Sequence, residues 1–130
     1  MTRDELVAHW LESSETNYRS MRTMWNSGEY VWALFVGHLC IEKLLKACYV
    51  RYVDTSTPRI HDLYKLAHRC GLVMTEEQKD SLQYVTLFNI EARYEEYKHE
   101  FYLKCTRSFT EKNIATIEEL RTWLLGKINN

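Results

Sequence analysis

The stretch Tyr30–Tyr52, YVWALFVGHLCIEKLLKACYVRY, decides the fold of this chain. In its first half, from Tyr30 to Ile41, only Gly37 and His38 fall outside the hydrophobic residues. In its second half, apolar side chains recur every three or four residues, which is the period of one helix face. The stretch contains no proline and many good helix formers. We therefore predict that it forms the central, buried helix of an all-α protein.

Helix-start signals flank this stretch on both sides. Thr2-Arg3-Asp4-Glu5 and Thr75-Glu76-Glu77-Gln78 have the form of a capping box, in which two side chains satisfy free backbone N–H groups. Ser108-Phe109-Thr110-Glu111 repeats that form before a last amphipathic segment. We expect helices at about residues 2–26, 30–52, 61–69, 75–90 and 108–128. The chain is therefore predicted to be an all-α, up-and-down helical bundle of four long helices plus a short one.

The composition limits the domain organisation and the classes of partner. With 130 residues, four Gly and one Pro, the chain is expected to form a single domain, 1–130, with its own core. Its 17 basic and 18 acidic residues nearly cancel, so no overall charge attracts it to nucleic acid or to an anionic membrane. Any contact with RNA would depend on a local basic patch.

Neither a metal site nor a membrane segment is expected. The four cysteines show no CxxC or paired Cys/His spacing of the kind that binds zinc, and no motif implies a cofactor. The longest strictly apolar run, Tyr30 to Val36, is far shorter than a membrane span, and the charged first residues contain no apolar signal region. We expect a cytoplasmic protein with reduced thiols.

Three short motifs, in this order, carry a family resemblance. The central helix ends in E-K-L-L-K-A (Glu42–Ala47), and His61-Asp62-Leu63 follows after a loop that contains Pro58. Ala92-Arg93-Tyr94 then lies within FNIEARYEEYKHEFYLKCT, residues 88–106. The motifs and their spacing resemble the HEPN domain family over nearly the whole chain. The resemblance implies a HEPN-like helical bundle, a homodimer, and a small prokaryotic protein of the kind paired with minimal nucleotidyltransferases.

Within this resemblance, Arg93 and His99 match the pair that defines catalytic HEPN proteins, an Arg followed after four to six residues by a His. Five residues intervene here. The pair implies metal-independent cleavage of RNA, as in toxins silenced by a nucleotidyltransferase antitoxin. A His can take the proton from a ribose 2′-hydroxyl or return one to the leaving oxygen. An Arg can hold the phosphate while negative charge builds. Arg93 and His99 are therefore the expected catalytic residues of an endoribonuclease.

Two positions depart from the pattern of the catalytic members. Tyr94 follows Arg93, where those members often carry a small polar residue. Family toxins accept AMP on a Tyr two residues beyond the His, and this chain has Phe101 at that spacing with Tyr102 next to it.

The alternative is a non-catalytic HEPN module that binds a nucleotide or a partner protein. In that case Arg93 has a structural role, pairing with Glu91 or another carboxylate and capping the end of its helix, and His99 is an exposed polar residue in a charged loop. Related non-catalytic members keep Ala-Arg-Tyr without the His. The residues themselves leave both functions open.

The segment 93–107 shows no clear helical period, and we expect it to be irregular and rich in functional residues. It interleaves aromatic and basic side chains, a pattern that suits base stacking combined with phosphate contacts. The candidates for binding RNA or a nucleotide are Tyr94, Tyr97, Lys98, Tyr102 and Lys104.

Polar residues around the central helix have plainer expected roles. Glu42 and Lys46 are expected to form an i,i+4 pair on a solvated face. His38 is expected to be a core histidine with its hydrogen bonds satisfied. His61 and Asp62 are expected to begin a short helix, where an acidic side chain favours the positive end of the helix dipole.

Overall fold

The computed structural model describes residues 1–129, and every regular element in that range is a helix. The six helices are α1 (Arg3–Asn26), α2 (Tyr30–Tyr52), α3 (Leu63–Arg69), α4 (Glu76–Glu91), α5 (Glu95–Lys104) and α6 (Arg107–Ile128). The all-α class and the helical bundle are as predicted, with one helix more than expected.

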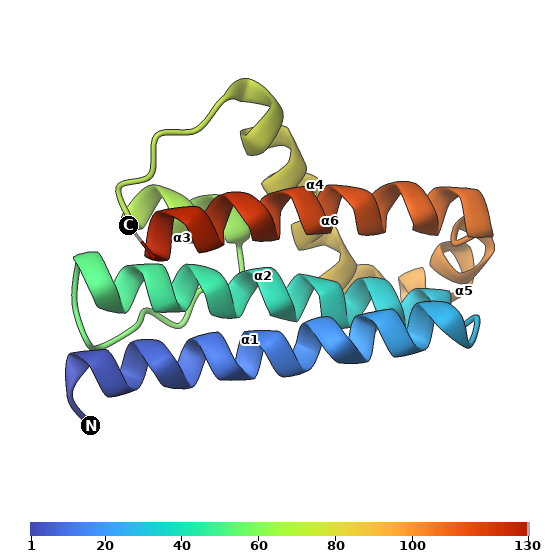
Figure 1. Cartoon of the computed structure of the whole chain (residues 1–130). Helices are drawn as coiled ribbons and strands as arrows, with labels where there is room; N and C mark the ends of the chain where they lie inside the picture. Colours follow the sequence, from blue (N-terminus) through green and yellow to red (C-terminus); the bar gives the residue numbers. More distant parts are fainter. Residues whose placement is uncertain (130) are drawn as a thin grey trace.

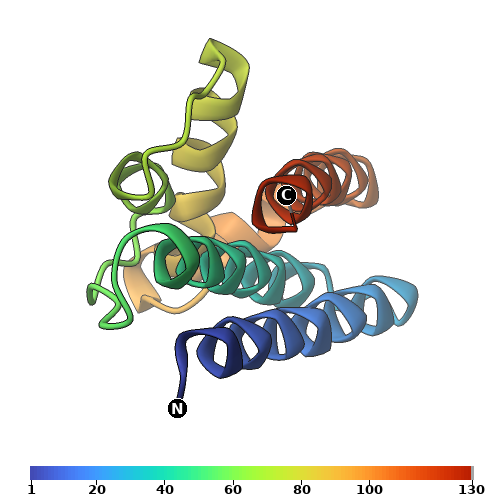
Figure 2. The ribbon, with the colours of Figure 1, turned by 60° about the vertical axis from the view of Figure 1, so that its left-hand side comes forward.

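The second helix is the centre of the molecule. α1 runs antiparallel along one side of α2, and α6 packs along another (Figure 1). α3 and α4 contact the remaining side of α2, opposite α1 (Figure 2). Buried residues occur along α2 from Ala33 to Val50, and they include the charged Glu42 and the histidine His38. The segment Tyr30–Tyr52, which is apolar on most of its surface, therefore forms the helix that has neighbours on most sides.

The predicted helix starts are correct at two of the three capping-box sequences. Thr2 and Thr75 both form complete capping boxes, and Gly28, which follows the C-cap Ser27 of α1, adopts φ +80°. The third capping box was misplaced. Thr106, and not Ser108, caps α6, because its hydroxyl accepts the Phe109 N–H at 3.2 Å.

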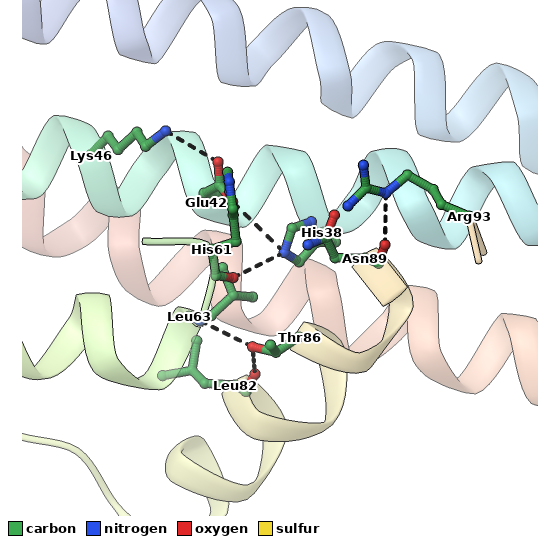
Figure 3. Close-up of polar contacts among 9 residues, drawn as sticks. All are labelled: His38, Glu42, Lys46, His61, Leu63, Leu82, Thr86, Asn89 and Arg93. Carbon is green, nitrogen blue, oxygen red and sulfur yellow. Dashed lines mark hydrogen bonds and ion pairs between the residues drawn. The ribbon is translucent and has the colours of Figure 1, made fainter. Parts of the chain in front are cut away.

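The short helix after the loop begins two residues later than expected, at Leu63. Asp62 is its N-cap, since a carboxylate oxygen of Asp62 accepts the Lys65 N–H at 3.0 Å. His61 therefore lies in the loop before α3, with its backbone carbonyl directed at α2 (Figure 3). This position brings His61 next to the polar side chains of α2.

The prediction that residues 93–107 are irregular is wrong, because ten of them form α5. Only one side chain within α5 is buried, that of Phe101, whose ring centroid lies 5.7 Å from that of Phe88 on α4. A short helix anchored by one aromatic residue has no repeating apolar stripe. The periodicity that revealed the longer helices is therefore missing here.

Candidate functional site

Arg93 lies in the turn between α4 and α5, with its side chain directed back toward α2 (Figure 3). Its Nε donates to the Asn89 carbonyl at 2.8 Å, and its guanidinium carbon lies 5.7 Å from the ring centroids of both Phe35 and Tyr94. Arg93 thus caps the end of α4 through a carbonyl, where the alternative interpretation expected a carboxylate. Within residues 1–129 this is the only hydrogen bond of the guanidinium. Its two terminal nitrogens therefore remain available to bind an anion.

His99 lies in the middle of α5 and is exposed. It is two positions from the buried Phe101, and two positions correspond to about 200° around a helix. The imidazole consequently sits on the outer face of α5, while the Arg93 guanidinium stacks against α2. Within this chain the two predicted catalytic residues therefore lie on different sides of this segment.

The five predicted RNA-binding residues fall into two groups with different surroundings, three tyrosines and two lysines. Tyr94, Tyr97 and Tyr102 are between about half and two thirds exposed, as a stacking surface requires. Lys98 instead pairs with Glu95 at 3.4 Å. Lys104 is drawn toward α4 and α6, where its Nζ lies 5.6 Å from the Tyr84 ring centroid and 5.4 Å from that of Phe109. The three tyrosines are therefore exposed for stacking, whereas the two lysines are engaged by neighbouring side chains.

A surface hollow of about 490 Å³ adjoins one of these tyrosines. It lies between the α1–α2 turn and the link from α5 to α6, and Trp32, Tyr102 and Leu103 are among its lining residues. Neither Arg93 nor His99 lines it. The hollow is therefore separate from the predicted catalytic pair.

Glu42 is the centre of a polar cluster on α2, and the expectation that it lies on a solvated face is wrong. Its side chain is only 6% exposed. One carboxylate oxygen accepts from Lys46 Nζ at 3.2 Å, and the other accepts from His61 Nδ1 at 3.0 Å (Figure 3). Burial raises the pKa of this carboxyl, but the hydrogen bond from His61 and the charge of Lys46 outweigh that effect. The pKa of Glu42 therefore falls below its ordinary value of 4.5, and the group is ionised at neutral pH.

His38 lies one turn before Glu42 and is fully buried, so it is a core histidine as predicted, but the expectation that all its hydrogen bonds are satisfied is wrong. Its Nε2 lies 3.4 Å from the His61 carbonyl oxygen and 3.9 Å from Glu42. Both neighbours are acceptors, which places the proton on Nε2. Nδ1 is buried without a hydrogen-bond partner among the described residues. Burial lowers the pKa of His38 by more than the nearby carboxylate raises it, so the ring is held neutral.

Sequence reasoning found the parts of this cluster but not the whole. The spacing of His38, Glu42 and Lys46 places them on one face of a helix, and that signal was available. His61 comes from a loop, whose path over α2 no helical period predicts. The burial of the Glu42 carboxylate is explained only by both of its partners, His61 and Lys46.

A model of the family described as "HEPN domain" matches residues 7–128. The chain belongs to the HEPN family. The matched range includes Arg93, His99 and the Glu42 cluster, and the helical bundle agrees with the all-α fold of HEPN domains. Searches of the curated proteins and of the solved structures gave no match.

Two negative findings complete the description. No helix in residues 1–129 of this HEPN protein is sufficiently long and apolar to cross a membrane. In the same range, no group of three or more His, Cys, Asp or Glu side chains is arranged to hold a metal ion.

Proposed function

We propose that this HEPN protein is an endoribonuclease that cleaves RNA without a metal ion, with Arg93 and His99 at its site. The observation that carries the proposal is the exposed Arg93, which is fixed through Nε alone and is followed six residues later by an exposed His99. A guanidinium held in this way presents two terminal nitrogens to a phosphate.

The reaction needs only groups that RNA and these two residues supply. The ribose 2′-oxygen attacks the adjacent phosphorus and loses its proton, while the bond from phosphorus to the 5′-oxygen breaks. Arg93 stabilises the extra negative charge on the phosphate oxygens. His99 takes part in the proton transfers near neutral pH. The products are a 2′,3′-cyclic phosphate and a 5′-hydroxyl.

The proposal also includes a homodimer and a partner protein. Because His99 lies on the outer face of α5, a second protomer that packs against this face would bring further groups to the cleft. We propose that two copies form a composite site of this kind. We further propose that the protein acts as a cytoplasmic toxin whose antitoxin is a minimal nucleotidyltransferase.

A non-catalytic HEPN module that binds a nucleotide or a partner protein is the second candidate. The helix-capping contact of Arg93 favours it, because that contact gives the residue a structural role without any substrate. The negative charges of Glu95, Glu96 and Glu100 around His99 also oppose the approach of a phosphate.

Alanine variants separate the two functions. His99→Ala should abolish cleavage with almost no change in melting temperature, because the side chain is exposed. Arg93→Ala should also abolish cleavage, and the loss of one hydrogen bond should cost about 1 kcal/mol of stability. Cleavage of a labelled RNA and thermal melting of each variant give both readouts. Full activity in either variant would remove that residue from the site.

A further inference from the structure

Four side chains form a row along one face of α2. Phe35, His38, Glu42 and Lys46 are spaced by three, four and four residues, so they follow one another along the helix. Two segments outside α2 contact this row. Arg93 stacks on Phe35. His61 bonds to His38 and Glu42 (Figure 3).

His61 is held in one orientation from several directions. Its carbonyl accepts from His38 Nε2 at 3.4 Å. Two residues later, the Leu63 N–H donates to the Thr86 hydroxyl of α4 at 3.0 Å. The Thr86 hydroxyl in turn donates to the Leu82 carbonyl at 2.8 Å. The backbone at His61 is thus held against α2 and, two residues later, against α4, which leaves the ring little conformational freedom.

The hydrogen bond to Glu42 also decides which nitrogen of His61 carries the proton. An ionised carboxylate only accepts, so His61 Nδ1 is the donor in the 3.0 Å contact. In the neutral ring, Nε2 then carries the lone pair. The His61 side chain is 65% exposed while its carboxylate partner is 6% exposed. This is the arrangement of a buried carboxylate that orients a solvent-facing proton acceptor.

His61 and Arg93 lie over the same face of α2. Arg93 sits at the level of Phe35 and His61 at the level of Glu42, seven residues further along the helix. At 1.5 Å per residue this is a separation of about 10 Å along the axis. Lys46, one turn beyond Glu42, adds a positive charge to the same face. The face therefore carries both a guanidinium and an oriented imidazole.

We propose that His61, oriented by Glu42, is an acid/base residue of the same cleavage site as Arg93, and that the RNA lies along this face of α2. The inference rests on the proposed function, which leaves one of two proton transfers unassigned. His61 Nε2 takes the proton of the 2′-hydroxyl as the 2′-oxygen bonds to phosphorus. Protonated His99, which the proposed dimer brings to this cleft, gives its proton to the 5′-oxygen as that bond breaks. Solvent then restores both rings.

The contributions of His61 and Glu42 differ in kind. His61 touches the reacting hydroxyl, whereas Glu42 acts through His61 and is a positioning residue. The Glu42 carboxylate also stabilises the imidazolium that forms when His61 takes up the proton. Lys46 and the neutral His38 are the other titratable groups of α2 at this carboxylate, and Arg93 faces the row from the α4–α5 turn.

The test compares His61→Gln and Glu42→Gln with the control His68→Gln, an exposed histidine on α3, in cleavage of a labelled RNA. His61→Gln should lower kcat by about 10² to 10⁴-fold. Glu42→Gln should lower kcat by about 10²-fold with little change in KM, since it misplaces the ring. The control should keep the activity of the unmodified protein.

A spectroscopic measurement examines the geometry without relying on activity. Nitrogen-15 shifts of His61 in the unmodified protein should show the tautomer protonated on Nδ1, and Glu42→Gln should shift the population toward the tautomer protonated on Nε2. An Nε2-protonated ring in the unmodified protein overturns the inference. If His61→Gln fails to fold, His61→Ala with added imidazole replaces it, and absence of rescue in a folded His61→Ala counts against the role.

The outcomes distinguish a failure of the proposed role of His61 from a failure of the proposed ribonuclease function. Normal cleavage by His61→Gln, together with an inactive His99→Ala, overturns the role of His61 and leaves the ribonuclease intact. No cleavage by the unmodified protein overturns both.

Discussion

At the scale of single residues, the sequence identifies the candidate site residues but does not predict the contacts that surround them. Arg93 and His99 stand out because they match the Arg–His pair that the resemblance to catalytic HEPN proteins implies. The helix-capping bond of Arg93 and the outward position of His99 depend on α5, which has no periodic signal. The burial of Glu42 depends on the path of the loop that carries His61. These contacts join residues far apart in the chain, so no local pattern predicts them.

The buried His38 makes a prediction about stability and pH. Burial lowers its pKa in the folded protein below the ordinary value of 6.5. Below pH 6.5 the unfolded chain therefore binds more protons at this residue than the folded chain does, and folding is disfavoured. The contribution of His38 is complete above pH 6.5 and is lost as the pH falls below it. Urea denaturation between pH 7.5 and pH 5.5 should show a falling free energy of unfolding.

The matched variants are His38→Gln and His9→Gln. Gln does not titrate but can still donate to the His61 carbonyl, so His38→Gln should show a smaller decrease in stability over this range. His9 is exposed on α1, and its replacement should leave the decrease unchanged. An equal decrease in all three proteins would show that His38 does not cause it.

At the scale of helices, the sequence predicts the elements whose apolar faces repeat. α1, α2, α4 and α6 lie within a few residues of their predicted ranges, since each buries a long stripe or carries a recognisable cap. The short helices were predicted less well. α3 starts later than expected, because Asp62 is its cap, and α5 was missed, because Phe101 alone anchors it.

Gly37 shows how closely α2 is packed. A Cβ atom at this position would lie 2.7 Å from a methyl group of Ile117 on α6 and 2.9 Å from the sulfur of Met21 on α1. Both neighbours are fully buried and have little room to move. Overpacking of this kind costs about 1–3 kcal/mol, more than the gain of up to about 1 kcal/mol from replacing a helical Gly by Ala. Gly37→Ala should therefore be destabilised in urea denaturation.

Gly126 on α6 is the matched control, because a Cβ atom there would meet nothing within 4 Å. Gly126→Ala should gain about 0.5–1 kcal/mol from helix propensity alone. Equal stabilisation by the two substitutions would contradict close packing of α2 against its neighbours at Gly37.

At the scale of the whole molecule, the proposed cleft depends on a second copy. The outer face of α5 carries His99 together with exposed aromatic and aliphatic side chains, among them Tyr102 and Leu103. Covering this face would remove apolar surface from water and bring groups of the partner to His99. Family membership follows from the whole chain and was predictable from the order of its motifs. The proposed interface would join two molecules, and no pattern within one chain defines it.

Dilution tests whether cleavage depends on a second copy of the chain. If the dimer builds the cleft, specific activity should fall as the protein is diluted through its dissociation constant, in step with the mass measured by light scattering or analytical ultracentrifugation. A proven monomer with full specific activity would contradict a composite site.

Metal-independent RNA cleavage that depends on His99 is tested most directly with a labelled, structured RNA in excess EDTA, comparing the unmodified protein with His99→Ala. We expect cleavage by the unmodified protein alone, with products that end in a 2′,3′-cyclic phosphate. Equal cleavage by both proteins, or none by the unmodified protein in its folded dimeric form, would contradict it.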